Sequence, residues 1–330
     1  MDRREFEKDL LNQNITEKYL SMSGEELEEK FGSEFLKVVD FGNQNNNHHQ
    51  YELFEHILRT VDSIPTDGFS QEDALKVKIA AFFHDIGKPN VAQINEKTGQ
   101  TQYIGHAKQS AEISTSILQG LGYSEQEIAE LKFLIQSHDD FIPIAKKEDI
   151  TAERISKVLA SIAKKTENYT PTISDFKRLI ALCKGDAMAQ NKVIERNGEI
   201  VDTQEDKISR LGAIEQILPS AIILQQESEI QKLEKQKSEL FNGPAPIERK
   251  GRIVNQRQID LWRLKSEEQK KSEIDAIDAK IAELKQQEDK LLEKDNQHEE
   301  KAKKLEESMK ELRELSEQVK KLERLKGNIK

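Results

Sequence analysis

The chain has 330 residues, of which 35% are hydrophobic and 34% are charged, and its formal net charge is -10. Residues 1–200 hold 33 of the 61 acidic and 24 of the 51 basic side chains, a net charge of -9 that argues against broad binding of nucleic acid. The single cysteine, Cys183, excludes an internal disulfide or a cysteine-based zinc cluster. No run approaches 18 apolar residues, so no membrane-spanning helix is expected. The N-terminus has no apolar core like that of a signal peptide, and a cytoplasmic protein is therefore expected.

The first 200 residues have the pattern of a helical globular protein, and they contain all but two of the aromatic residues. Apolar residues at steps of three and four predict short helices before residue 40. Further helices are expected over 53–61, 74–83, 107–121, 124–138, 153–163 and 173–189. Ser124 and Glu127 fit a capping box, and Asn197-Gly198 predicts a short hairpin near 194–202. The predicted fold class is all-α.

The last 130 residues are rich in charge and have a different periodicity. Apolar residues near heptad spacing occur at Ile230, Leu233 and Leu240, stop at the GPAP sequence of 243–246, and resume from Ile274 to Ile329 with polar breaks. A coiled coil is therefore expected, as a hairpin or an arm, and a long solvated helix is the alternative. The coiled coil would serve self-association, through residues 256–326, or the binding of a partner protein. The sequence does not decide whether its helices pair within one chain or between chains. The expected domains are a helical extension (1–42), a globular helical domain (43–203) and this coiled-coil region (204–330).

Histidines and aspartates recur on or at the ends of the predicted helices in the first half. They are His56, His84, Asp85, His106, His138, Asp139 and Asp186. Imidazole and carboxylate groups are the expected ligands of Zn, Fe, Mn or Ni. A single histidine in an apolar helix is more often a hydrogen-bonded or surface residue, but the joint pattern favours a metal site. Gly87 is expected to end its helix, so that Lys88 turns back toward the same cavity.

The order H…HD…H…HD…D, with the phrases YELFEHILRTV, AAFFHDIGKP, GHAKQSAE and LCKGDAMAQ, resembles the HD superfamily of metal-dependent phosphohydrolases. The resemblance covers roughly residues 43–190. The stretch from GHAKQSAE through LGYS to the second HD looks most like the HD module attached to tRNA nucleotidyltransferases. About 45 residues precede this module, too few for a nucleotidyltransferase head, so addition of CCA is not expected.

The resemblance implies a role for each matching position. The ligands that define the family are matched by His56, His84, Asp85 and Asp186, and the extra histidines of its two-metal members by His106 and His138. Asp85 would then bridge two ions. The implied cofactor is one or two divalent ions, of Mn, Fe, Ni, Zn or Mg.

Three further residues are implied to take part in the reaction. Lys88 matches a lysine that meets the substrate phosphate, and His49 matches a less regular histidine near that phosphate, with His48 as its competitor. Asp139 is expected to hold a ligand histidine in its tautomer, or else to act as an acid or base. The catalytic candidates are thus Asp85, Lys88 and Asp139, and the candidates for substrate binding are His49 and Lys88.

The expected activity is hydrolysis of a nucleotide or related phosphate ester, as a phosphohydrolase or phosphodiesterase, by a metal-activated water. Cyclic 2′,3′-phosphates, nucleoside phosphates and dinucleoside polyphosphates all lie within the range of the family. Two alternatives remain. The same six ligands serve a di-iron oxygenase in some proteins of this fold, and an HD module without activity would be a sensor or scaffold whose coiled coil binds a partner.

Overall fold

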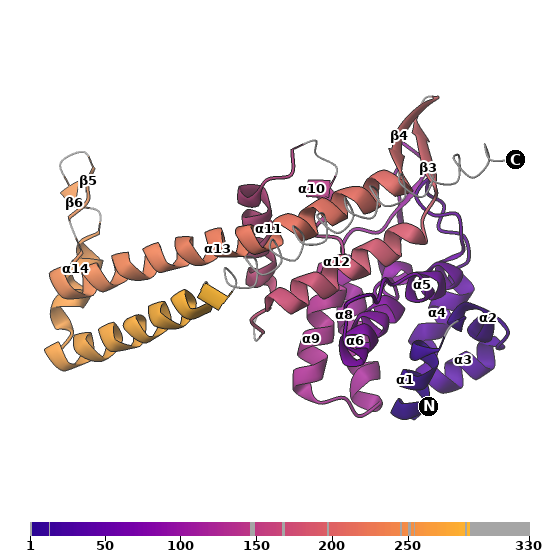
Figure 1. The fold of residues 1–330 in the computed structure, drawn as a ribbon, viewed down its shortest axis with the longest axis horizontal. Coiled ribbons are helices and arrows are strands. Elements are labelled where there is room, and N and C mark those ends of the chain that lie inside the picture. Colours follow the sequence, from indigo (N-terminus) through magenta and orange to yellow (C-terminus); the bar gives the residue numbers. More distant parts are fainter. Residues whose placement is uncertain are drawn as a thin grey trace, which may run out of the picture. The chain divides into compact units, whose positions relative to one another are not determined.

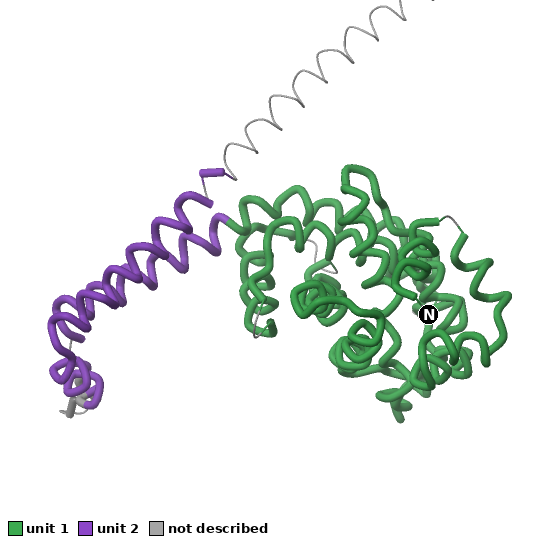
Figure 2. Tube along the Cα trace, turned by 90° about the horizontal axis from the view of Figure 1, so that it is seen from below, with its two compact units in different colours: residues 1–222 green, residues 223–330 purple. Residues whose placement is uncertain are grey.

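The computed structural model describes residues 2–12, 14–145, 149–166, 169–196, 198–244, 246–249, 252–253, 255–287 and 289–290. The chain divides into two compact units, residues 1–222 and 223–330 (Figure 2). Helices make up most of the described residues, which confirms the all-α class (Figure 1). None of the described helices is long and apolar enough to span a membrane.

Four short helices precede residue 42, as predicted. They are α1 (Arg3–Leu11), α2 (Ile15–Leu20), α3 (Gly24–Phe31) and α4 (Ser33–Phe41). Their aromatic side chains pack around Phe82 of a later helix, with Phe35 stacked on its ring at 5.1 Å and Phe6, Tyr19 and Phe31 within 6 Å of it. Aromatic burial of this kind contributes strongly to a core. The N-terminal helices therefore share one core with the helices that follow.

Six longer helices occur where the periodicity predicts them: α5 (Leu53–Asp62), α6 (Gln71–Phe83), α8 (His106–Gly120), α9 (Glu125–Ser137), α11 (Ala152–Lys165) and α12 (Ile173–Met188). Two single turns, α7 (Lys88–Val91) and α10 (Ile142–Ala145), lie between them. The predicted capping box of Ser124 and Glu127 begins α9. Helix α6 is central, since it packs against α1, α5, α9 and α12 and ends in the buried run 79–83. Residues 79–83 are apolar and buried on every side of the helix, which suits this end of α6 to a central position.

A buried ion-pair network joins α12 to the start of α6. The guanidinium of Arg178 donates hydrogen bonds to the carboxylates of Asp175, on its own helix, and Asp73, on α6. Arg178 and Asp175 are both buried, and removing one partner from such a pair is costly because a charge is left without compensation. The network therefore fixes how α12 lies along α6.

Short antiparallel strands interrupt the helices. Strands β3 (Val193–Arg196) and β4 (Glu199–Thr203) form the predicted hairpin, with Val193 opposite Thr203. A second small hairpin, β1 (Gln93–Ile94) with β2 (Thr101–Gln102), has no alternating signature in the sequence. Helix α13 (Gln204–Asn242) follows β4 directly, and within the first unit it buries Leu211, Ile214 and Leu218.

The second unit contains an antiparallel helical hairpin formed within the chain. The end of α13 lies beside a helix over 267–287. Ile230, Ile281 and Leu284 form the buried contact. The Gln226 amide donates a hydrogen bond to Gln287 at 3.1 Å, and the Lys237 ammonium donates one to Asp278 at 2.6 Å. The later residue of α13 thus pairs with the earlier residue of the second helix, so the two helices are antiparallel.

The connection between these two helices is longer than the predicted proline turn. It contains β5 (Glu248–Arg249), β6 (Arg252–Ile253) and α14 (Gln256–Leu264). Trp262 of α14 donates a hydrogen bond to the Leu240 carbonyl at 2.8 Å, next to the end of α13. The heptad positions after residue 290 lie outside the described residues. The coiled coil, the self-association and the domain boundaries therefore stay predictions.

Candidate metal centre

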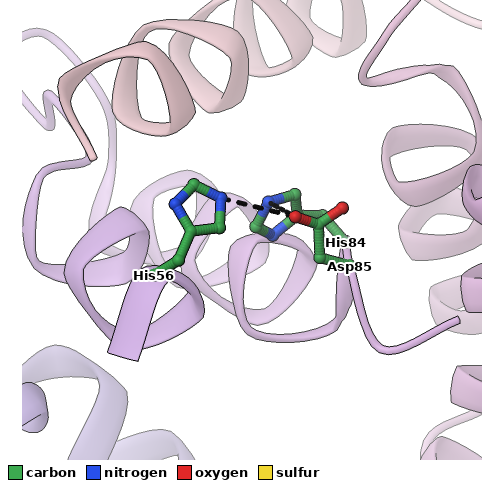
Figure 3. A group of neighbouring side chains, drawn as sticks. All are labelled: His56, His84 and Asp85. Carbon is green, nitrogen blue, oxygen red and sulfur yellow. Dashed lines mark ion pairs between the residues drawn. The ribbon is translucent and has the colours of Figure 1, made fainter. Parts of the chain in front are cut away.

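The carboxylate of Asp85 lies between two pairs of histidines. Its Oδ2 atom is 3.3 Å from His56 Nε2 and 3.2 Å from His84 Nε2. Figure 3 shows these three side chains, with dashed lines for the ion pairs. Its Oδ1 atom is 3.2 Å from His106 Nε2 and 3.8 Å from His138 Nε2. Asp85 follows the apolar end of α6 and is only 2% exposed. Each carboxylate oxygen therefore faces a different pair of imidazoles.

Asp186 completes the first of these two groups. It projects from α12, and its Oδ1 atom lies 3.1 Å from His56 Nε2 and 3.8 Å from His84 Nε2. Its Oδ2 atom accepts a hydrogen bond from the Gln190 amide at 3.0 Å. All six residues predicted as ligands are thus brought together, from α5, α8, α12 and the residues that end α6 and α9.

Backbone carbonyls hold the other ring nitrogen of every histidine in the cluster. The Nδ1 contacts are His56 with Ala189 (3.2 Å), His84 with Ala81 (2.7 Å), His106 with Tyr103 (2.8 Å) and His138 with Ile135 (2.7 Å). A carbonyl oxygen only accepts, so Nδ1 carries the proton and Nε2 presents its lone pair to the cluster. For His84, His106 and His138, the carbonyl belongs to the residue three positions earlier in the chain. The local turn therefore sets the tautomer of these three histidines.

The buried atoms of the cluster fit a divalent ion. His56 Nε2, His84 Nε2, Asp85 Oδ1 and Asp186 Oδ1 are buried with no hydrogen-bond partner. The Nε2 atoms of His106 and His138 face each other at 3.1 Å, an arrangement that places two acceptors together. A cation in each of the two groups would satisfy these atoms, and a mixed nitrogen and oxygen set suits Zn, Fe, Mn or Ni. The potential ligands form two groups that share Asp85.

Charges within the cluster favour ionised carboxylates. Burial opposes ionisation, but His84 and Lys88 hold the pKa of Asp85 well below its usual value, and His56 and His84 do the same for Asp186. Burial likewise opposes protonation of His84, yet the two carboxylates raise its pKa to about 10. In the absence of an ion, a proton therefore competes for the nitrogen that would bind metal.

Lys88 contacts the same carboxylate from the cavity side. Its ammonium lies 2.6 Å from Asp85 Oδ2, donates to Gln44 Oε1 at 2.9 Å and lies 3.2 Å from His49 Nε2. Burial and the charge of Lys88 hold the pKa of His49 well below its usual value, so the imidazole is neutral and accepts this hydrogen bond. Of the two candidate histidines, His49 makes this contact, whereas the side chain of His48 is exposed.

Asp139 lies at the more open side of the second group. Its side chain is 41% exposed, with Oδ2 3.3 Å from His106 Nε2 and Oδ1 3.5 Å from His138 Nε2. These are the nitrogens that face the cluster, and the opposite nitrogens are already held by backbone carbonyls. Asp139 therefore does not hold the tautomer of either histidine, because it faces Nε2 and not Nδ1.

The profile of the HD domain family matches residues 48–225, which is more than half of the chain. The chain belongs to the HD domain family. HD domains bind divalent metals and define a superfamily of the metal-dependent phosphohydrolase type. The match includes all six residues of the cluster and extends into α13.

Two curated proteins resemble part of this chain. The CC-adding tRNA nucleotidyltransferase of Thermus thermophilus is 29% identical over 99 residues, 30% of this chain and 22% of that protein. The A-adding tRNA nucleotidyltransferase of Deinococcus radiodurans is 29% identical over 91 residues, 27% of this chain and 20% of that protein. The chain thus matches about a fifth of the length of each relative, and the predicted resemblance is confirmed. No solved structure gave a significant match.

A cavity of about 610 Å³ adjoins the cluster of the HD domain, and several of the residues around it were not predicted. Gln44 is buried beneath Lys88, and the Tyr103 hydroxyl donates to the Gln44 carbonyl. Cys183 lines the cavity, and its thiol donates to the His138 carbonyl at 3.0 Å. Gln44 lies in a polar stretch without a motif. Gln190 is the last residue of the LCKGDAMAQ phrase, in which the family resemblance implies a role only for Asp186.

Proposed function

We propose that this HD domain is a metal-dependent phosphohydrolase or phosphodiesterase that acts on a nucleotide or related phosphate ester. The observation that carries the proposal is the shared carboxylate of Asp85, with a buried ammonium 2.6 Å from it. One divalent ion would be held by His56, His84, Asp85 and Asp186, and a second by Asp85, His106 and His138. When bound, such ions polarise a phosphoryl oxygen and lower the pKa of a bound water.

The residues around the ions have separate tasks in this proposal. Lys88 supplies positive charge where a phosphoryl group gains negative charge in the transition state. Gln44 and neutral His49 both accept hydrogen bonds from its ammonium and so hold it in place. Asp139 is partly exposed, which allows its carboxylate to exchange protons with solvent and with a leaving oxygen.

The size and charge of the cavity favour a small substrate. A volume of about 610 Å³ is in the range of sites that enclose a nucleotide-sized molecule. The surrounding first 200 residues are acidic, with a net charge of -9. A phosphate is therefore captured locally, by ions and by cationic side chains in the cavity, and not by a broad basic face.

Hydrolysis by metal-loaded protein tests the proposal. The full chain is loaded in turn with Mn²⁺, Fe²⁺, Ni²⁺, Zn²⁺ or Mg²⁺ and supplied with bis-p-nitrophenyl phosphate, 2′,3′-cyclic nucleotides and nucleoside phosphates. Asp85→Asn is expected to lower the rate by about a thousandfold. Asp67→Asn makes the same chemical change at an exposed loop position and is expected to leave the rate unchanged.

Three results would overturn the proposal. Equal rates for the two variants would separate hydrolysis from the cluster. Oxygen-dependent turnover with iron, without phosphate release, would support the oxygenase alternative. A lack of hydrolysis with every ion, although the ions bind, would support a sensor or scaffold.

A further inference from the structure

The cavity beside the metal cluster extends onto the first turns of α13. Lys207, Arg210 and Leu211 of that helix line its wall, together with Asp202 at the end of β4. These residues lie outside the predicted catalytic set and come from a different part of the fold. The sequence pattern provides no motif for them. Their charges raise the question of what part of a substrate they face.

The side-chain amide of Gln190 connects Lys207 to the metal cluster. The Lys207 ammonium donates a hydrogen bond to Gln190 Oε1 at 2.8 Å, and Gln190 Nε2 donates one to Asp186 Oδ2 at 3.0 Å. Lys207 is therefore held beside the cluster without being part of it. Its side chain is only 15% exposed, so a ligand in the cavity meets this charge in a poorly solvated place.

Among the described residues of this wall, two cationic side chains lie near one carboxylate. Asp202 lies 3.8 Å from the Lys207 ammonium and 4.0 Å from Arg210 Nη1, so one carboxylate faces two cations. Arg210 Nη1 also donates to the Ala145 carbonyl at 3.1 Å, which orients the guanidinium. A guanidinium has five N–H donors, and its planar fork matches the oxygens of a phosphate.

The cavity therefore has cationic side chains at two places. Lys88 contacts Asp85 at the metal cluster, whereas Lys207 and Arg210 lie near Asp202. A substrate with a single phosphate, bound at the ions and Lys88, would have no phosphate near Lys207 and Arg210. We propose that Lys207 and Arg210 bind a second phosphate, so that the preferred substrates are nucleotides with at least two phosphate groups. This proposal rests on the proposed function and specifies its substrate class.

Binding of two nucleotides that differ by one phosphate tests the proposal. Isothermal titration calorimetry of the Mn²⁺-loaded full chain gives the Kd of AMP and of adenosine 5′-methylenediphosphonate. The wild type is expected to bind the diphosphonate about tenfold more tightly, the scale of one or two charged hydrogen bonds. The double variant Lys207→Gln, Arg210→Gln is expected to bring this ratio close to one. Lys192→Gln, at an exposed position in the same segment, is expected to keep it.

Asp202→Asn is the complementary variant, because it removes the carboxylate that faces both cations. It is expected to increase the preference for the diphosphonate several-fold, a result that loss of structure does not mimic. The second phosphate site would be refuted if the double variant kept the wild-type ratio of the two Kd values, even with both affinities lowered.

Chromatography of AMP and ADP after incubation with the Mn²⁺-loaded full chain separates this proposal from the proposed function, because ADP has the phosphoanhydride bond that the diphosphonate lacks. A preference that depends on Lys207 and Arg210, without any hydrolysis, would retain the phosphate site and refute the hydrolase. Hydrolysis of AMP with no preference for the diphosphonate in wild type would retain the hydrolase and refute the site.

Discussion

Gly87 lies directly against the backbone of Ser110. A Cβ atom at position 87 would lie 2.5 Å from the Ser110 nitrogen and 2.7 Å from the His106 carbonyl oxygen. The Gly87 N–H also donates to Ser110 Oγ at 2.9 Å. The φ angle of Gly87 is -83°, which any residue adopts, so glycine is required here for space and not for its conformational freedom. The HDIGK and GHAKQS motifs are therefore joined by contact.

Gly87→Ala is expected to destabilise the protein and to weaken the second metal group. The new methyl group must displace the backbone that carries His106, an overpacking that costs about 2 kcal/mol in the free energy of unfolding. Urea denaturation of the metal-free protein measures this cost. Metal analysis under equal conditions is expected to show reduced content.

Gly120→Ala is the matched control, because nothing lies within 4 Å of a Cβ at that helical position. It is expected to be neutral or to stabilise by roughly 0.5 kcal/mol through helix propensity. Equal stability of the two variants would show that the close approach at Gly87 is wrong.

Lys88→Gln is expected to slow hydrolysis without loss of metal. The ammonium provides charge to the phosphoryl group, and its removal is expected to lower kcat/KM by about a hundredfold or more. Because the ammonium lies 2.6 Å from Asp85 Oδ2, its removal also frees that oxygen, so metal affinity is expected to be equal or higher. Lys108→Gln changes an exposed lysine on α8 and is expected to have no effect on either quantity. A proportional loss of metal and activity in Lys88→Gln would give Lys88 a structural role only.

The contact of Arg3 with Glu127 predicts a stability that depends on acid pH. The hydrogen bond from Arg3 lowers the pKa of Glu127 from 4.5 to about 2, with help from Ser124. A carboxylate whose pKa is depressed on folding contributes stability above its unfolded value, and this contribution is lost as the pH falls toward 2. Glu127→Gln is therefore expected to be less stable than wild type at pH 7, by an amount that shrinks between pH 4.5 and 2.

Chemical denaturation at a series of pH values measures the effect. Glu125→Gln, in the same first turn of α9 but exposed, is expected to differ little from wild type. A difference between Glu127→Gln and wild type that is constant down to pH 2 would contradict the ion pair.

The heptad pattern predicts self-association through the C-terminal region. Within the described residues, Ile230, Ile281 and Leu284 already pack against each other inside one chain. The apolar positions available for another copy are therefore expected mainly after residue 290. Light scattering of the full chain is expected to give an oligomer, and a chain ended after residue 290 is expected to shift toward the monomer mass. Equal masses would refute the prediction.

The helices and the metal cluster were accessible from the sequence because their signals are local. A period of 3.6 residues identifies α5, α6, α8, α9, α11 and α12 without knowledge of how they pack. The cluster was predicted because the order of its histidines and aspartates, within phrases such as AAFFHDIGKP, resembles that of a family. The structure adds the reason for their tautomers, which is the backbone carbonyl three residues before His84, His106 and His138.

Contacts between residues far apart in the chain could not be predicted from the sequence, because they have no local signal. Gln44 is an ordinary amide, and only the fold brings it to Lys88. The contact of Gln190 with Asp186 is local, whereas its contact with Lys207 depends on the fold. Gly87 was expected to end a helix, whereas its close contact with Ser110 depends on how α8 crosses the turn. The position of Lys207 in the wall of the cavity likewise depends on the hairpin of β3 and β4, which immediately precedes α13.

Metal stoichiometry tests the central claim, that Asp85 joins two metal-binding groups. Metal-free full chain is incubated with Mn²⁺, passed over a desalting column and analysed for bound metal per chain. Wild type is expected to bind two ions. His138→Gln is expected to bind one, because it leaves His56, His84, Asp85 and Asp186 intact, and Asp85→Asn is expected to bind less than one. The same metal content in Asp85→Asn as in wild type would show that Asp85 is not a shared ligand.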